Sequence, residues 1–300
     1  YGRRGNLTVD SLPVAEGVDS PIAEGVERVD AGPAELSETF WRQAWGREEA
    51  AVSVTFADKD AERLVSFLTT RGLARAQRLR SDVVPWLAPL AILTTEDIAL
   101  RLFFRRISIL GAEHLPTDGP VLLAPTHRAR WDALILPKAA GRRVSGRDCR
   151  FMVTTTEMSG LQGWFLHRLG CFAIDQSKPG TASLRYALDL LADQQQVVLF
   201  PEGRINRDGA PITVAPGLPR LASLAQTKGL GSVPVIPIGI AYTRRLPRWG
   251  DCAALCFGPQ LRLEGSGKAA ALALAERIQQ GMRSAEEAAR SCIAAGENEA

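Results

Sequence analysis

Short apolar runs alternate with amphipathic stretches from about residue 106 onward. Strand-like runs occur at Arg106–Leu110, Val121–Ala124, Arg150–Thr154, Phe172–Asp175, Val197–Phe200 and Val233–Ile240. Helical spacing of apolar residues fills the intervals at about Ala133–Ala140, Glu157–Leu169, Thr181–Ala192 and Leu218–Lys228. Short strands that alternate with helices predict an α/β fold with a mixed, mostly parallel sheet flanked by helices.

Two further elements follow this alternating region. Cys252–Phe257 alternates in the manner of a strand, and we interpret it as an edge strand of the sheet. Lys268 to about Ala295 is rich in Ala, Glu and Arg and predicts a C-terminal helix. We therefore expect one α/β domain over residues 106–265, followed by a helical segment over residues 266–300.

The region before the α/β domain divides into two parts. Residues 1–55 are acidic, rich in Gly and Pro and without periodicity, which predicts a disordered extension. Residues 56–105 are helical in pattern, with leucines and arginines interleaved between Ala61 and Leu79, then apolar runs at Val83–Leu93 and Ile98–Phe104.

The first of these apolar runs is too short to cross a membrane. It has about 11 residues and two prolines, whereas a helix that spans a bilayer needs roughly 20. Arginines flank the region on both sides, and Trp86 and Phe103 lie near its ends. This pattern favours an interfacial helix in the headgroup region; an ordinary pair of core-packing helices is the alternative.

Composition adds limits on partners and compartment. The net charge is +3, yet residues 1–50 hold ten acids and five bases, so the remainder is clearly basic. A basic body suits phosphate-bearing substrates and anionic lipid surfaces, although a solvated basic face would look the same. The five cysteines have neither a disulfide framework nor metal-ligand spacing, so we expect reduced, packed thiols and no metal. No secretory signal is visible after Tyr1.

The best candidate for a catalytic base is His127, which lies five residues before Asp132 at the end of an apolar strand. On an ideal helix this spacing leaves two side chains roughly 140° apart. A turn that contains His127 and opens into a helix at Asp132 would pair them. A carboxylate on one ring nitrogen fixes the tautomer and makes the other nitrogen a better base. A surface histidine with an unrelated aspartate is the alternative.

Two later blocks also end a strand and enter a loop, namely Gly170–Asp175 and Val197–Arg204. Because parallel strands end at one edge of a sheet, Asp175 and Glu202 should emerge beside His127. Arg204 and Arg207 follow Glu202, and guanidinium groups bind phosphate well. A Pro-Gly turn with solvated arginines is the alternative.

These three blocks, with Leu115-Pro116 before them and Val233–Gly239 after them, resemble the glycerolipid acyltransferase family that makes phosphatidic acid. The resemblance covers roughly residues 100–260. It implies that residues 106–265 form the catalytic domain, with His127 as general base oriented by Asp132. Substrate contacts would come from Glu202, Gly203, Arg204, Arg207, Asp175 and Lys178.

The same resemblance implies the partners. The acyl donor would be acyl-CoA or acyl carrier protein, and the acceptor a lysophospholipid, first of all 1-acyl-sn-glycerol-3-phosphate. No metal, cofactor or nucleic acid is expected. The protein would lie peripherally on the cytoplasmic face of a membrane.

The chain departs from the family pattern at several positions. Ala129 stands where the family has serine, Gln176 where it often has arginine, and Arg204-Ile205-Asn206 where it has Thr-Arg-Ser. Acylation of glycerol 3-phosphate or another lyso-lipid therefore stays open, as do a hydrolase or thioesterase and a non-catalytic lipid-binding relative. The chain has no Gly-x-Ser-x-Gly elbow, so we expect direct acyl transfer without a covalent intermediate.

Overall fold

The computed structural model describes residues 86–158, 160–174 and 181–298. All of them belong to one compact unit, Glu62–Ala300. Three predictions lie outside the described residues: the extension over residues 1–55, the helix between Ala61 and Leu79, and the placement of Asp175 and Lys178.

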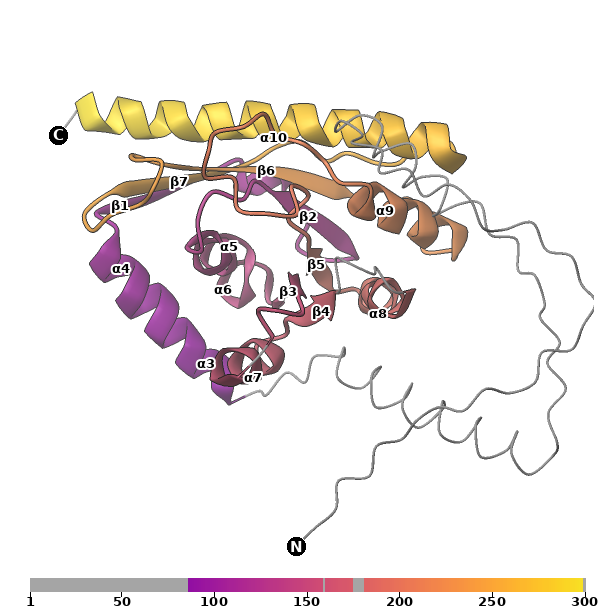
Figure 1. Ribbon diagram of the computed structural model, residues 1–300, viewed down its shortest axis with the longest axis horizontal. Helices are drawn as coiled ribbons and strands as arrows, with labels where there is room; N and C mark the ends of the chain where they lie inside the picture. The colour runs from indigo at the N-terminus through magenta and orange to yellow at the C-terminus, as the bar shows by residue number, and fades with distance from the viewer. Residues whose placement is uncertain (1–85, 159, 175–180, 299–300) are drawn as a thin grey trace, which may run out of the picture. The chain divides into compact units, whose positions relative to one another are not determined.

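A seven-stranded sheet organises the described residues (Figure 1). The strands are β1 Arg106–Leu110, β2 Val121–Pro125, β3 Cys149–Thr154, β4 Phe172–Ile174, β5 Gln196–Val198, β6 Val235–Tyr242 and β7 Cys252–Phe257. They are arranged in the order β1-β7-β6-β2-β5-β3-β4. Neighbouring strands are parallel except β6 and β7, which are antiparallel. The predicted mixed, mostly parallel sheet is confirmed.

The prediction that Cys252–Phe257 is an edge strand is wrong. Strand β7 lies between β1 and β6 and pairs with both. Nearly every residue of β7 is buried, because α10 covers one of its faces and the core cluster around Leu255 covers the other. The edge on this side of the sheet is β1, whose residues are all exposed or half-buried, as is typical of an edge strand.

Helices cover both faces of the sheet (Figure 1). One face carries α3 Leu87–Ile92, α4 Leu100–Phe103, α5 Asp132–Ala140 and α7 Gly160–Arg168, with the short α6 Arg142–Ser145 after α5. The other carries α8 Thr181–Ala192, α9 Gly217–Thr227 and α10 Gly267–Asn298. Within β2, Leu123 faces the first layer, whereas Leu122 and Ala124 face the second. The flanking helices of the prediction are therefore confirmed.

The apolar segments before the sheet form one uninterrupted helix instead of the two expected segments. A π-helical stretch, Leu93–Ala99, joins α3 directly to α4. Leu87, Ala88 and Leu100 face the core. None of the described helices has the combined length and apolar character that crossing a bilayer requires.

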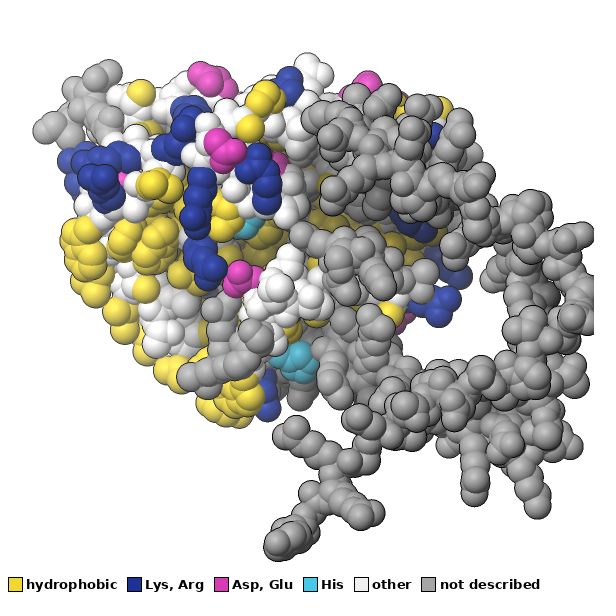
Figure 2. Space-filling view, viewed as in Figure 1, with side chains coloured by type: hydrophobic (Ala, Val, Ile, Leu, Met, Phe, Trp, Pro, Cys, Tyr) yellow, Lys and Arg dark blue, Asp and Glu magenta, His cyan; other side chains and the backbone are white. Residues whose placement is uncertain are grey.

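The opposite face of this helix exposes large apolar side chains. Trp86, Leu90, Leu93, Ile98 and Leu102 are each between 47% and 68% exposed. Their spacing is four, three, five and four residues, and the five-residue step falls inside the π-helical stretch. Because a π-helix bonds residue i to i+5, this step keeps all five side chains on one stripe, which we call the apolar stripe. Figure 2 shows apolar side chains along the side of the molecule where α3 and α4 lie.

Helix α10 lies very close to β6 because small residues face each other there. A Cβ atom at Gly239 would lie 1.9 Å from the backbone nitrogen of Glu286, and one at Gly281 would lie 2.7 Å from Cγ of Pro237. Only glycine at these positions permits the approach. The close packing brings Glu286 to the edge of the sheet at which β2 and β6 end.

Replacing Gly239 by Ala should therefore destabilise the protein. The added methyl group has to push α10 away from β6, and overpacking of this kind costs about 1–3 kcal/mol. Chemical unfolding of the variant would measure the loss. Gly217→Ala is the matched control, because no heavy atom lies near its Cβ position at the start of α9. Equal stability of the two variants would contradict the tight β6–α10 contact.

Candidate active site

The loop between β2 and α5 carries the predicted base. Strand β2 ends at Pro125 and α5 begins at Asp132, so His127 lies in the turn between them. Thr126 fastens the loop to β6, because its backbone nitrogen donates to the Ile238 carbonyl at 2.9 Å and its hydroxyl accepts from Ile240 N at 2.9 Å. The loop thus starts from a fixed position at the edge of the sheet.

The loop brings His127 and Asp132 together, as their spacing predicts. Nδ1 of His127 lies 2.9 Å from Oδ2 of Asp132. The imidazole stacks on the Phe200 ring, with 3.9 Å between ring centroids. The His127 side chain is 17% exposed, and among the described residues no hydrogen bond to its Nε2 occurs. One ring nitrogen is therefore held while the other remains accessible.

Asp132 is a fully buried carboxylate with donors around both of its oxygens. Besides His127, the backbone N–H groups of Arg128 and Ala129 donate to Oδ2 at 2.6 and 2.9 Å. The Tyr242 hydroxyl donates to Oδ1 at 2.5 Å. Buried carboxylate oxygens without such partners would be costly, and these four bonds satisfy both oxygens of Asp132. At position 129 the backbone makes the contact, and the alanine side chain takes no part in it.

Tyr242 is held in its protonated form by its surroundings. Burial raises the pKa of its phenol well above the ordinary value, and the charge and hydrogen bond of Asp132 raise it further. The phenol therefore serves as a permanent donor to the carboxylate.

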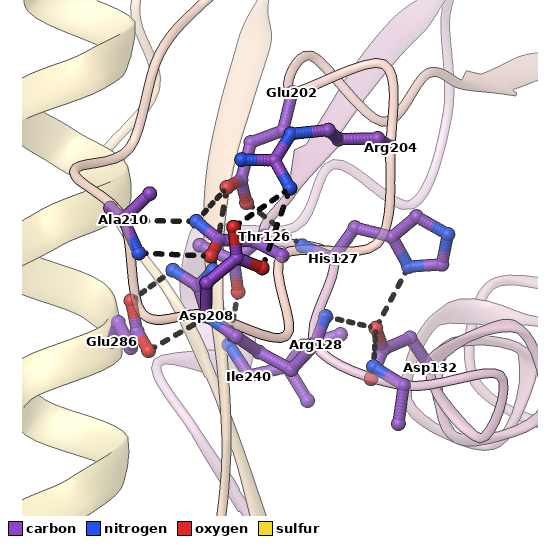
Figure 3. A network of polar contacts seen from close by, with 12 residues as sticks. Thr126, His127, Arg128, Asp132, Glu202, Arg204, Asp208, Ala210, Ile240 and Glu286 are labelled. Carbon is purple, nitrogen blue, oxygen red and sulfur yellow. Dashed lines mark hydrogen bonds and ion pairs between the residues drawn. The ribbon is translucent and has the colours of Figure 1, made fainter. Parts of the chain in front are cut away.

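Glu202 supports the loop from the other side (Figure 3). Its Oε1 accepts from the backbone nitrogen of His127 at 3.0 Å. Its Oε2 accepts from Asn206 Nδ2 at 2.7 Å and from Arg128 Nη1 at 3.3 Å. Only 3% of the side chain is exposed. Sequence reasoning expects a substrate contact at Glu202, whereas the structure engages both of its oxygens with protein donors.

Arg128 leaves the loop in the direction opposite to the imidazole and reaches α10 (Figure 3). Its guanidinium forms a two-point ion pair with Glu286, with N–O distances of 2.9 and 2.6 Å. Arg290 adds a third bond to Glu286 at 2.6 Å. Burial alone would raise the pKa of Glu286, but the bonds and charges of Arg128 and Arg290 outweigh it and hold this pKa below the usual value.

The predicted phosphate-binding residues follow Glu202 in an exposed loop. Gly203 adopts a left-handed conformation with φ of 67°. Arg204 is exposed and lies 3.3 Å from Asp208, and Arg207 is exposed as well. Asn206 closes the loop, since its side-chain oxygen accepts from Ala210 N and its amide donates to the Ala210 carbonyl. The structure thus places Glu202 beside His127 and both arginines on the same loop.

Sequence reasoning missed the residues that support the pair. Tyr242 follows the apolar block Val233–Gly239 by three positions, and Arg128 is the residue after His127. Both therefore lie beside motifs that the sequence analysis identifies. Nothing in the sequence signals that Glu286 lies against Arg128, because 158 residues separate them. The pairing depends on where α10 crosses β6.

Replacing Tyr242 by Phe should destabilise the fold while preserving its shape. The change leaves Oδ1 of the buried Asp132 without its phenolic donor, and an unsatisfied buried group costs about 1–3 kcal/mol. Chemical unfolding would measure this loss. An unchanged free energy of unfolding would show that water or another donor replaces the phenol.

Part of the chain is similar to known proteins. Residues 106–241 match the model of the Acyltransferase family. Human 1-acyl-sn-glycerol-3-phosphate acyltransferase alpha is 26% identical over 191 residues, covering 60% of this chain and 64% of the human protein. The 1-acyl-sn-glycerol-3-phosphate acyltransferase of Bacillus subtilis (strain 168) is 24% identical over 132 residues, covering 44% and 60%. The matches thus span less than two thirds of these relatives.

Among solved structures, the 1-acyl-sn-glycerophosphate (LPA) acyltransferase PlsC from Thermotoga maritima aligns with 74% of this chain and 93% of its own, at 17% identity and a TM-score of 0.47. The resemblance read from the four sequence blocks is confirmed by the family match and the curated relatives. Residues 106–241 match the Acyltransferase family, and the chain is a distant relative of the 1-acyl-sn-glycerol-3-phosphate acyltransferases.

Proposed function

We propose that the protein transfers a fatty acyl group from a thioester to the hydroxyl of 1-acyl-sn-glycerol-3-phosphate, which yields phosphatidic acid. The observation that carries this proposal is the imidazole of His127, held at Nδ1 by a buried carboxylate and accessible at Nε2. The names of the curated relatives support the choice of acceptor.

The reaction needs a single proton carrier. Nε2 of His127 takes the proton of the acceptor hydroxyl as its oxygen attacks the thioester carbonyl carbon. The new C–O bond forms, the C–S bond breaks, and the leaving thiolate receives the proton from the imidazolium. Asp132 stabilises that imidazolium while the proton is carried. The thioester is already activated, so the chain requires no nucleophile of its own.

The acceptor phosphate would be held by the loop that follows Glu202. Arg204 and Arg207 are exposed there, and the ion pair of Arg204 with Asp208 is solvent-accessible and therefore weak enough to exchange. A phosphate dianion offers stronger bidentate partners than one exposed carboxylate. Glu202 would position this loop and His127 together, and Asp175 and Lys178 stay predicted substrate contacts.

Replacing His127 by Ala should lower acyl transfer at least about a hundredfold, the lower end expected for a lost general base. Purified protein would be given a labelled acyl thioester and a panel of lysophosphatidate, glycerol 3-phosphate and a neutral lyso-lipid, and the esterified product identified. His114→Gln is the control, because His114 follows β1 and so lies at the opposite edge of the sheet.

The outcomes separate the alternatives. Near-normal transfer by a folded His127→Ala protein would reject the mechanism. Release of free fatty acid without ester would indicate a hydrolase. Binding to lipid vesicles without turnover on any acceptor would favour a non-catalytic relative. Esterification of glycerol 3-phosphate in preference to lysophosphatidate would change the acceptor and leave the mechanism in place.

We also propose that the protein binds peripherally to the cytoplasmic face of a membrane through the apolar stripe. Large exposed apolar patches of this kind mark interaction surfaces. Trp249, which is 70% exposed, extends the patch, since its ring lies 6.0 Å from that of Phe103. Phe103 in turn stacks on Trp131, the residue before Asp132, at 4.1 Å. An acyl chain that enters from the bilayer would meet the catalytic loop at this aromatic contact.

The double substitution Leu90→Glu and Leu93→Glu should weaken binding to vesicles that contain anionic lipid by roughly tenfold or more, because it removes two apolar groups from the interface and adds like charge. Co-sedimentation with vesicles would measure the change. Leu272→Glu is the matched control, since Leu272 is 42% exposed on α10, which covers the other face of the sheet. Equal binding by both variants would reject the apolar stripe as the membrane contact.

A further inference from the structure

A cavity of about 370 Å³ lies between the end of β6, the loop that follows Glu202, and α10. It is of the size that small-molecule sites usually have. Its lining is unusually rich in cations, with Arg128, Arg244, Arg245, Arg283 and Arg290. The acids in the lining are Glu286 and Glu287. Figure 2 shows Lys and Arg side chains gathered on the face below α10, beside a hollow in the surface.

Three of these arginines already have carboxylate partners. Arg128 and Arg290 share Glu286, and Arg244 lies 2.7 Å from Asp251. The other two, Arg245 and Arg283, form no ion pair or hydrogen bond with any of the residues that the structure describes. They converge on the cavity from different elements, the turn after β6 and helix α10. Guanidinium groups placed in this way are available to an anion.

The loop is shaped to receive one of them. Gly209 adopts a left-handed conformation with φ of 69°, and a Cβ there would lie 1.9 Å from Nη2 of Arg245. The guanidinium therefore occupies the space that any other residue at position 209 would fill. The hydrogen bonds between Asn206 and Ala210 hold this turn in place. The Arg245 guanidinium thus lies against this turn at the cavity, on an exposed side chain.

We propose that this cavity binds a phosphate group of a substrate through Arg245 and Arg283, and we assign that phosphate to the nucleotide part of coenzyme A. The assignment rests on the proposed acyl transfer and names its donor. Phosphate oxygens match the forked donors of arginine better than any other common anion except carboxylate.

Geometry favours the donor over the acceptor as the source of the phosphate. The cavity lies on the side of the loop toward which Arg128 points, whereas the imidazole points the other way (Figure 3). In lysophosphatidate the reacting hydroxyl and the phosphate sit on adjacent carbons, so its phosphate must stay close to Nε2. In acyl-CoA the pantetheine chain separates the thioester from the diphosphate and the 3′-phosphate. Only acyl-CoA is therefore long enough to place its phosphates in the cavity while its thioester lies at Nε2 of His127.

The test is equilibrium binding of coenzyme A to the full chain, measured by calorimetry without turnover. Arg245→Ala and Arg283→Ala should each weaken binding about tenfold or more, as expected for one lost bond between charged groups. Dephospho-coenzyme A, which lacks the 3′-phosphate, should bind more weakly to the unaltered protein and lose less on either substitution. Arg277→Ala is the control, because Arg277 lies on the same helix, outside the cavity, and pairs with Glu264.

Gly209→Ala gives a second, independent variant. It keeps every charge but displaces the Arg245 guanidinium, so it should weaken coenzyme A binding as Arg245→Ala does. A thermal unfolding measurement would establish that the variant is folded. Arg245→Lys keeps the charge but loses the forked donors, so its affinity for coenzyme A should lie between those of the unaltered protein and Arg245→Ala.

Four results would overturn the proposal. The first is unchanged coenzyme A affinity in both arginine variants. The second is a raised KM for lysophosphatidate with unchanged coenzyme A affinity, which would move the phosphate to the acceptor. The third is an equal loss of coenzyme A affinity in Arg277→Ala, which would show that the loss comes from the lower net charge and not from the cavity. The fourth is acyl transfer from carrier protein by a chain that does not bind coenzyme A, which would reject this site and leave the proposed function standing. Coenzyme A binding that depends on these arginines, without any acyl transfer, would instead reject the proposed function and leave this site standing.

Discussion

The buried carboxylate of Asp132 is the constraint on which the site depends. A carboxylate with no exposed surface requires hydrogen-bond donors around it, and two parts of the chain supply four of them. The start of α5 places the carboxylate, the preceding turn offers two backbone N–H groups and an imidazole, and the end of β6 offers a phenol. The turn has to adopt the shape that brings these donors to the Asp132 carboxylate, and this shape sets the orientation of the His127 ring.

A second charge, on Arg128, fixes the outer side of the same turn. Its guanidinium is largely buried between Glu202 and Glu286. Burial lowers the pKa of Arg128, but the hydrogen bonds and charges of Glu286 and Glu202 outweigh this effect, so the pKa lies above its usual value. Glu286 reaches this position only because Gly239 lets α10 lie against β6. The turn that carries His127 is therefore held from α5 and β6 on one side and from α10 on the other. Its geometry depends on a helix more than 150 residues away in the sequence.

The sequence was sufficient for whatever is local and periodic. Strands such as Arg106–Leu110 and helices such as Thr181–Ala192 match their predictions residue for residue, because burial imposes a period that the chain displays directly. The turn from His127 to Asp132 was also predictable, since five residues cannot pair on a straight helix. The position of β7 was not, because an interior strand of small residues and an edge strand have the same alternation until a neighbour is assigned. The pairing of Arg128 with Glu286 was equally hidden, because no local pattern encodes a contact between distant elements.

The two sides of the turn that carries His127 have opposite chemical character, and the proposed reaction, with its amphiphilic substrates, needs both. Toward α3 and α4 the turn meets aromatic rings, with Phe103 on Trp131 and Phe104 on Tyr242, and beyond them the apolar stripe. Toward α10 it meets ion pairs and the guanidinium groups of Arg245 and Arg283, which have no ion-pair partner among the described residues. A fatty acyl thioester has the same polarity, with a hydrocarbon chain at one end and phosphates at the other. Because His127 lies at the boundary, the proposed proton carrier would meet the reactive carbon of such a molecule when each end of the molecule occupies the surface that suits it.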